Sequence, residues 1–273
     1  MPEITANGLR FHVRDSGSGP VAILLHGFPD TGEVWRHQVP ALMAAGLRVV
    51  VPDMRGRGRS ERPLSVDDYR LTNVASDVTA ILDALGVERA HVVGHDFGAA
   101  VAWLVASLFP QRVDRLAVLS VGFPGAAGPP DLEALQKGWY RILIQTEGVA
   151  EDLARQDDWY LFRTLFGGAA DTDAYIAELS DPAALTAGFN WYRANLPLSR
   201  LLAPPPTLPL VRAPTLGMWS SGDLYLTERA MTASESRVTG GWRYERIEDA
   251  THWLQVDQPE RVNALLLEHL EGR

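Results

Sequence analysis

The chain has 273 residues, of which 46% are hydrophobic and 22% are charged, a balance that allows one large domain or a core with a sizeable insert. Its net charge of −9 argues against a nucleic-acid partner, because phosphate binding requires a basic surface. The absence of cysteine excludes disulfide bonds, cysteine-ligated zinc and a thiol nucleophile.

The N-terminal segment, MPEITANGLRFHVRD, lacks the basic and then apolar pattern of a signal peptide. No apolar run reaches the roughly 18 residues of a membrane span. We therefore expect a soluble cytoplasmic protein with no membrane partner. No pattern in the sequence reports the oligomeric state, so a homodimer stays open.

In the first half of the chain, short apolar runs alternate with helical stretches, which predicts a largely parallel sheet wrapped by helices. The opening segments EITANG and LRFHVRD are expected to pair as a hairpin. Helices should end at Gly86 and at Pro110, because glycine and proline commonly terminate helices. The predicted elements that follow are strands at Val21–Leu25 and Leu47–Val51, a helix at Thr72–Leu85, a strand at Ala90–Gly94, a helix at Gly98–Phe109 and a strand at Leu116–Val121.

The pattern then changes to a helical insert between two linkers. Gly125–Pro130 (GAAGPP) and Ala203–Pro209 (APPPTLP) have linker composition, and the aromatic-rich segment Leu132–Leu202 between them predicts helices only. Strands at Pro214–Met218 and Arg243–Ile247 and a last helix from Pro259 resume the earlier alternation. We expect a core formed by residues 1–128 and 206–273 and a helical cap formed by residues 129–205.

The segment Gly94-His95-Asp96-Phe97-Gly98 lies between a buried strand and an alanine-rich helix, which is the context of a nucleophile elbow. The turn is so tight that its flanking positions must be small, and glycine occupies both. The central side chain, Asp96, is then raised above the sheet, where the N-terminus of the next helix favours an anion. By itself the same segment also suits a plain turn with a capping aspartate.

Three further segments fit the same chemistry. His26-Gly27-Phe28-Pro29 follows the third strand, where the backbone N–H groups of Phe28 and Phe97 could hold one oxyanion. Asp223 in SGD and His252 in DATHW each follow a later strand. Taken singly, each is more typical of a turn or a surface loop. Together, the order nucleophile, acid, histidine is that of the α/β-hydrolases.

The sequence resembles the epoxide hydrolase branch of the α/β-hydrolase family over nearly its whole length. The resemblance rests on HGFPD at 26–30, DMRGRGRS at 53–60, GHDFG at 94–98, SGD at 221–223 and the loop around His252. It implies an α/β fold with a mostly parallel eight-stranded sheet, flanking helices and an inserted helical cap. The glycines of DMRGRGRS are expected to be structural, because no Gly-Lys-Ser/Thr follows them.

Two cap motifs extend the resemblance. GWYRILIQ at 138–145 and NWYR at 190–193 resemble the segments that carry the two cap tyrosines of this branch. The resemblance implies that Tyr140 and Tyr192 grip the epoxide oxygen, although amphipathic packing would also explain them. The substrate pocket is expected to include His26, Pro29, Trp35, Trp191 and Trp253.

The resemblance implies a two-step reaction on a small hydrophobic epoxide and water. Asp96 opens the ring while the tyrosines protonate its oxygen, and His252, oriented by Asp223, activates water to hydrolyse the ester. No cofactor and no metal is expected. His95 competes with His252 as the base, but a neighbour of the elbow residue normally points away from the site. Glu248 and Asp249 compete with Asp223 but share a loop with His252.

Three other functions stay open at this point. A haloalkane or haloacid dehalogenase would use the same Asp–His–Asp chemistry, but fluoroacetate-type dehalogenases carry arginine, and haloalkane dehalogenases typically tryptophan, where this chain has Phe97. A non-catalytic binding protein on a hydrolase scaffold would often lack a catalytic residue, whereas every proposed member is present here. A serine-type esterase is disfavoured because position 96 is aspartate.

Overall fold

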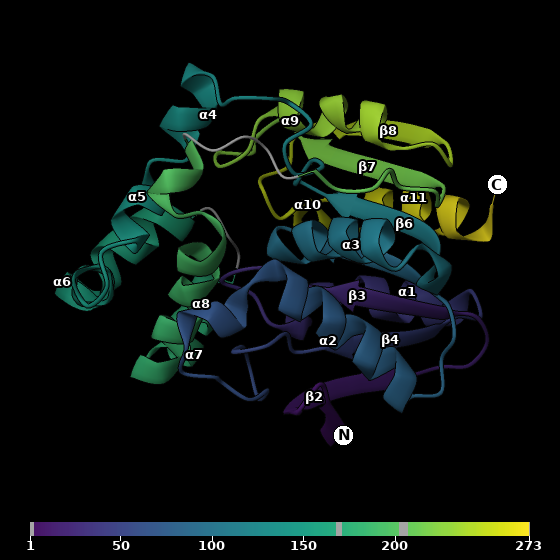
Figure 1. Cartoon of the computed structure of the whole chain (residues 1–273), viewed down its shortest axis with the longest axis horizontal. Helices are drawn as coiled ribbons and strands as arrows, with labels where there is room; N and C mark the ends of the chain where they lie inside the picture. The colour runs from purple at the N-terminus through teal and green to yellow at the C-terminus, as the bar shows by residue number, and fades with distance from the viewer. Residues whose placement is uncertain (1–2, 168–170, 202–206, 273) are drawn as a thin grey trace.

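A single eight-stranded sheet forms the centre of the computed structural model, which describes residues 3–167, 171–201 and 207–272 (Figure 1). The strand order is β1-β2-β4-β3-β5-β6-β7-β8, and every pairing from β4 to β8 is parallel. The predicted N-terminal hairpin is confirmed, and its second strand joins the sheet antiparallel to β4. The strands are β1 (Glu3–Ala6), β2 (Leu9–Ser16), β3 (Val21–Leu25), β4 (Arg48–Pro52), β5 (Ala90–His95), β6 (Val113–Leu119), β7 (Thr215–Ser220) and β8 (Trp242–Ile247).

The central strands are continuous apolar runs because helices cover both faces of the sheet. In β5 every residue is buried, and in β3 only Val21 is partly exposed. The parallel register pairs Leu25 with Gly94 and His95 with Leu119. The loops that follow these strands therefore gather at one edge of the sheet, where ligands bind in open α/β folds.

Helices α2 and α3 lie side by side on one face of the sheet, and α1 and α11 lie on the other (Figure 1). The three predicted core helices are confirmed, with the expected boundaries met to within one residue. Helix α1 was not predicted; its Pro40 lies in the first turn, where the missing N–H is not needed. The core helices are α1 (Gln38–Ala44), α2 (Leu71–Ala84), α3 (Phe97–Leu108), α9 (Glu228–Thr232), α10 (Leu254–Asp257) and α11 (Pro259–Glu271).

Five helices between β6 and β7 gather beyond one end of the sheet, at the left of Figure 1, and are called the cap below. They are α4 (Leu132–Lys137), α5 (Tyr140–Ile144), α6 (Val149–Phe166), α7 (Thr172–Leu179) and α8 (Pro182–Asn195). No strand occurs among the described residues of this segment, as predicted. Helix α6 is interrupted at Gln156–Trp159, where three residues take positive φ. The predicted boundary at residue 205 lies outside the described residues, so the division into core and cap stays a prediction.

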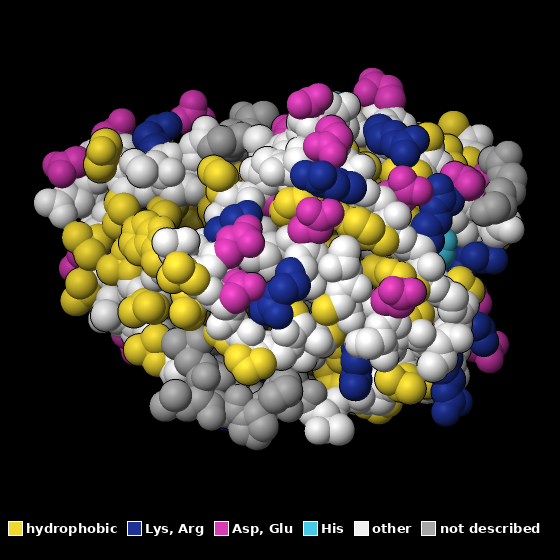
Figure 2. Space-filling view, turned by 90° about the horizontal axis from the view of Figure 1, so that it is seen from above, with side chains coloured by type: hydrophobic (Ala, Val, Ile, Leu, Met, Phe, Trp, Pro, Cys, Tyr) yellow, Lys and Arg dark blue, Asp and Glu magenta, His cyan; other side chains and the backbone are white. Residues whose placement is uncertain are grey.

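Exposed hydrophobic side chains are concentrated at the cap end of the molecule (Figure 2). They include Leu132, Leu135, Trp139 and Ile142 of α4, α5 and the turn between them. Within the part of the chain that the structure describes, no helix is long and apolar enough to cross a membrane.

Candidate active site

Asp96 occupies a strained turn between β5 and α3. Its φ of 52° and ψ of −125° lie outside the regions that L-residues favour, a strain that surrounding structure must hold in place. A Cβ added to Gly94 would lie 2.3 Å from the carbonyl oxygen of Gly98, and one added to Gly98 would lie 2.1 Å from that of Leu25. Only glycine fits at both flanking positions, so the backbone itself fixes the direction of the Asp96 side chain.

The two oxygens of the Asp96 carboxylate have different surroundings. Oδ1 accepts a hydrogen bond from the backbone N–H of Phe28 at 3.0 Å, and Oδ2 lies 3.5 Å from Nε2 of His252. Burial favours the neutral acid, but His252 and the Phe28 N–H outweigh it and lower the pKa of Asp96. Asp96 is therefore a carboxylate with one oxygen held by the backbone and the other facing an imidazole.

His252 and Asp223 form a buried pair beside this carboxylate. Nδ1 of His252 lies 2.8 Å from Oδ2 of Asp223, while Oδ1 of Asp223 accepts from the N–H groups of Tyr225 and Leu226. Burial opposes charge on His252, but the two carboxylates outweigh it and raise the pKa of His252 well above its usual range. Nδ1 thus donates to Asp223, and Nε2 is directed at Asp96.

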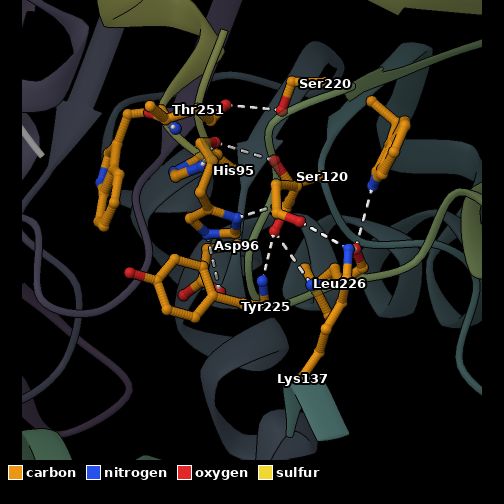
Figure 3. A network of polar contacts seen from close by, with 12 residues as sticks. His95, Asp96, Ser120, Lys137, Ser220, Tyr225, Leu226 and Thr251 are labelled. Atoms are coloured by element: carbon orange, nitrogen blue, oxygen red, sulfur yellow. Dashed lines mark hydrogen bonds and ion pairs between the residues drawn. The ribbon is translucent and has the colours of Figure 1, made fainter. Parts of the chain in front are cut away.

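The loop that carries His252 is fixed through its backbone carbonyls (Figure 3). Ser120 Oγ and His95 Nε2 both donate to the carbonyl oxygen of His252, at 3.1 and 2.9 Å, and Ser220 Oγ donates to that of Thr251 at 2.6 Å. The His95 side chain therefore supports the loop that carries His252 and does not face Asp96. The two rival acids, Glu248 and Asp249, are exposed, whereas Asp223 is bonded to the imidazole.

Tyr140 from α5 and Tyr192 from α8 meet above the nucleophile. Their ring centroids are 5.9 Å apart, and the Tyr192 ring lies 4.8 Å from that of Phe97 and 5.6 Å from that of Phe28. Burial, together with the nearby Tyr140 hydroxyl and Asp96, raises the pKa of Tyr192 well above its usual range. Its hydroxyl therefore keeps its proton at neutral pH and is available as a donor.

Of the predicted pocket residues, some pack against the site and others hold the loop that follows β3. Trp191 and Trp253 lie against the site, since their rings are 5.4 Å from Phe97 and 5.2 Å from His252 respectively. His26 stabilises the oxyanion loop itself, because Nδ1 contacts the carbonyl of Gly27 and Nε2 accepts from the N–H of Met54.

Pro29 and Trp35 lie in the segment that follows β3, and no hydrogen bond or ring contact among the described residues joins either of them to Asp96. The Pro29 carbonyl accepts a hydrogen bond from Arg57, and Trp35 is fully buried at the end of the short helix Gly32–Trp35. The contact of Phe97 N–H with an oxyanion, like the substrate contacts of His26, Pro29 and Trp35, stays a prediction.

The glycines of the DMRGRGRS segment are structural, as predicted. Asp53 accepts from the N–H groups of Gly32 and Arg59 and pairs with His12. Gly58 takes a φ of +52°, and a Cβ there would lie 2.3 Å from the Asp53 carboxylate. The segment folds around the Asp53 carboxylate and therefore offers no binding site for a phosphate.

The sequence did not single out three side chains that adjoin the site. The Tyr225 ring lies 5.1 Å from that of His252 and 5.8 Å from that of Tyr140, and Phe166 of α6 packs 5.7 Å from Phe28. The Arg141 guanidinium lies 5.7 Å from the Tyr140 ring. The only signal for Tyr225 was its position two residues after Asp223, and none pointed to Phe166.

Comparisons with known proteins identify the family and several similar proteins. Residues 20–167 match the alpha/beta hydrolase fold family. The chain is 32% identical to "Epoxide hydrolase A" of Mycobacterium tuberculosis, over 98% of this chain and 96% of that protein, and 31% identical to "Epoxide hydrolase 4" of Homo sapiens, over 96% and 76%. The crystal structure of epoxide hydrolase A from Mycobacterium thermoresistibile superposes with a TM-score of 0.84 at 31% identity, covering 99% of this chain and 98% of that one.

Proposed function

The chain belongs to the alpha/beta hydrolase fold family, and from this premise we propose that it hydrolyses epoxides to vicinal diols through a covalent ester on Asp96. It is an epoxide hydrolase by its similarity to proteins of that name over nearly its full length. The observation that supports the mechanism best is the divided carboxylate of Asp96, with Oδ1 on the Phe28 N–H and Oδ2 beside His252. The roles assigned to individual residues below are part of the proposal.

A carboxylate nucleophile limits the substrate to a saturated carbon that carries a leaving group. Attack on an ester carbonyl would give a reactive mixed anhydride, whereas attack on a saturated carbon gives a stable ester. A ring-opened epoxide leaves as a strongly basic alkoxide and needs a proton, while a halide needs none. The two hydroxyls above Asp96 therefore favour an epoxide.

In the first step Oδ2 of Asp96 forms a bond to one ring carbon, and the bond between that carbon and the ring oxygen breaks. The electron pair goes to the ring oxygen, which takes a proton from Tyr140 or Tyr192. The product is a hydroxyalkyl ester of Asp96, and one of the tyrosines is left as a tyrosinate. Oδ1 remains on the Phe28 N–H throughout.

In the second step His252 removes a proton from water, which attacks the carbonyl carbon of the ester. The Phe28 and Phe97 N–H groups stabilise the oxyanion on Oδ1. His252 then gives its proton to the departing diol oxygen, and the proton released by the new Asp96 carboxyl returns to the tyrosinate. Asp223 keeps the imidazole oriented during both transfers.

Formation of the ester changes the protonation of His252. In the free enzyme, Asp96 and Asp223 together hold the imidazole in its charged form. Once Asp96 is an ester, one of these two carboxylates is gone, and the pKa of His252 falls. The imidazole then releases its Nε2 proton to solvent and becomes the neutral base that the second step requires, and it takes up a proton again when Asp96 regains its charge.

The apolar side chains around the site favour a small hydrophobic epoxide. Phe28, Phe97, Phe166, Trp191 and Tyr225 surround the tyrosine pair with aromatic rings. A cytoplasmic location and the division into core and cap belong to the same proposal and rest on the sequence alone. The rival dehalogenase would use the same nucleophile but has no need for the two hydroxyls.

A product assay tests the proposal. Purified protein is incubated separately with a panel of hydrophobic epoxides and with matched haloalkanes, and diol and halide are quantified. We expect diol, with no halide above background, and no diol from the Asp96→Ala variant. Halide release faster than diol formation would assign the chain to the dehalogenases. Tight ligand binding with neither product would support a binding protein.

A further inference from the structure

Arg141, which follows the first cap tyrosine directly, is a partly buried cation without a carboxylate partner among the described residues. Its Nε atom is buried and unpaired, and the one hydrogen bond of its Nη2 atom is a long one, 3.4 Å to the carbonyl of Tyr225. No ion pair with a carboxylate is found for it among the described residues. A buried charge in this state is costly to the fold, which suggests that it has another role.

A second cap arginine has the carboxylate partner that a buried guanidinium usually has. Arg193, in the last turn of α8, donates to both oxygens of Glu151 at 2.7 and 2.9 Å and also contacts Asn190. Arg193 and Glu151 neutralise each other within the cap. Arg141 has no such acid, so its charge acts on the groups around the active site.

The surroundings of Arg141 direct its charge toward the proposed proton donors. Its guanidinium carbon lies 5.7 Å from the centre of the Tyr140 ring. A Cβ on Gly138 would meet the guanidinium at 3.4 Å, so the Arg141 side chain packs directly against the backbone of this glycine. Burial lowers the pKa of Arg141, but Tyr140, Tyr192 and Asp96 outweigh burial and raise it. The acidic groups that interact with Arg141 are therefore those of the reaction itself.

We propose that Arg141 is a positioning residue for ring opening, which holds the Tyr140 hydroxyl and stabilises the negative charge that Tyr140 carries after it has protonated the epoxide oxygen. This inference rests on the function proposed above. During the first step, negative charge leaves Asp96, which becomes a neutral ester, and arrives at the tyrosine pair. Arg141 lies on the side toward which the charge moves, where a fixed cation stabilises the transition state without reorganisation.

The test measures the two steps separately in rapid-mixing experiments with a neutral epoxide. Arg141→Gln should slow the alkylation of Asp96 by about 10- to 100-fold, somewhat less than the loss of a direct oxyanion donor, and should leave ester hydrolysis unchanged. Arg141→Lys should recover part of the rate because it retains a charge. Arg163→Gln is the matched control, since it removes a cap arginine whose partner, Asp173, is exposed.

A double-mutant cycle locates the effect. If Arg141 acts through Tyr140, the pair Tyr140→Phe/Arg141→Gln should alkylate no more slowly than Tyr140→Phe alone. Wild-type alkylation by Arg141→Gln, or an equal loss in the Tyr140→Phe background, would overturn the inference. A defect confined to epoxides with an acidic substituent would also overturn it and identify Arg141 as a substrate anchor.

The same set of variants separates this inference from the proposed function. If Tyr140→Phe itself alkylates Asp96 at the wild-type rate, the assignment of the proton donor fails. If Tyr140→Phe is slow and Arg141→Gln is not, only the role of Arg141 fails. Thermal unfolding of each variant identifies a loss of structure, and if Arg141→Gln does not fold, a loss in Arg141→Lys that is equally large in the wild-type and Tyr140→Phe backgrounds would still contradict the inference.

Discussion

The core and the cap supply the active site in different ways. On the core side, the backbone fixes each group: Asp96 by a glycine-flanked turn, and His252 through carbonyls that Ser120 and His95 hold. On the cap side, Tyr140 and Tyr192 are placed by ring packing at 4.8 to 6.4 Å centroid distances. Bond formation at carbon requires a fixed direction, which a backbone turn provides, whereas a proton donor needs only to stay within reach. Substitution of a core residue should therefore abolish the step in which that residue acts. Substitution of a cap tyrosine should only slow ring opening.

Replacing His252 is expected to have the largest effect on the rate of a single step. Replacing it with glutamine, or Asp223 with asparagine, should leave ring opening intact and slow ester hydrolysis by about 10⁴-fold, as for other triads that lose the base or its correct tautomer. The ester should then accumulate, and the intact-protein mass should rise by the mass of the epoxide. A slow variant of unchanged mass would assign His252 to structure instead.

A smaller effect, confined to the other step, is expected from the cap tyrosines. Tyr140→Phe and Tyr192→Phe should each slow alkylation, and the double variant should lose roughly 10²–10⁴-fold, the usual contribution of a positioned proton donor. Loss of both should exceed either single loss, because one hydroxyl can partly replace the other. The rate of Asp96 alkylation in stopped-flow experiments measures this directly. An unchanged rate in the double variant would show that the cap supplies no donor.

The pH dependence of the two steps should also differ. Ester hydrolysis requires neutral His252, so its rate should rise with pH through the pKa that His252 has in the ester, which is lower than in the free enzyme because Asp96 no longer carries a charge. Alkylation should not share this rise, since the raised pKa of Tyr192 keeps that donor protonated over the same range. Single-turnover rates at a series of pH values provide the comparison. If the rates of both steps fell together at low pH with the same apparent pKa, the assignment of His252 as the base of the second step alone would be contradicted.

The smallest effect is expected where the cap touches the core. Lys137, the only lysine of the chain, donates from the end of α4 to the carbonyls of Asp223 and Leu226 at 2.6 and 3.1 Å (Figure 3). Lys137→Met should keep the packing against Trp219 but remove the donor to the Asp223 carbonyl and leave the Leu226 carbonyl with only the Trp219 indole N–H at 3.4 Å, which should cost about 1–3 kcal/mol of unfolding free energy.

Because Lys137 holds the loop of Asp223, hydrolysis should slow more than alkylation in this variant. Chemical denaturation and the two single-turnover rates measure both effects. Glu133→Gln is the matched control, because it removes the acid that pairs with Lys137 at 3.3 Å and leaves both carbonyl contacts in place. A Lys137→Met variant with wild-type stability and rates would show that the cap needs no contact with the acid loop.

The core was more predictable from the sequence than the cap, for a physical reason. Asp96, Asp223 and His252 each follow a strand, so local patterns place them and the parallel sheet brings them together. Lys137 bonds to the Asp223 carbonyl, 86 residues away, and Arg141 approaches the Tyr225 carbonyl, 84 residues away, and no local pattern reports such pairings. The sequence also favoured helix throughout the cap but did not indicate the interruption of α6 at Gln156–Trp159.

The most direct test of the central claim, that Asp96 is the nucleophile, follows the oxygen in a single turnover. Enzyme in excess over epoxide reacts in water enriched in heavy oxygen, and both the diol and the peptide that contains Asp96 are analysed by mass spectrometry. We predict an unlabelled diol and heavy oxygen in Asp96, because water attacks the carbonyl carbon of the ester. Heavy oxygen in the diol with none in Asp96 would show that water opens the ring directly and would contradict covalent catalysis.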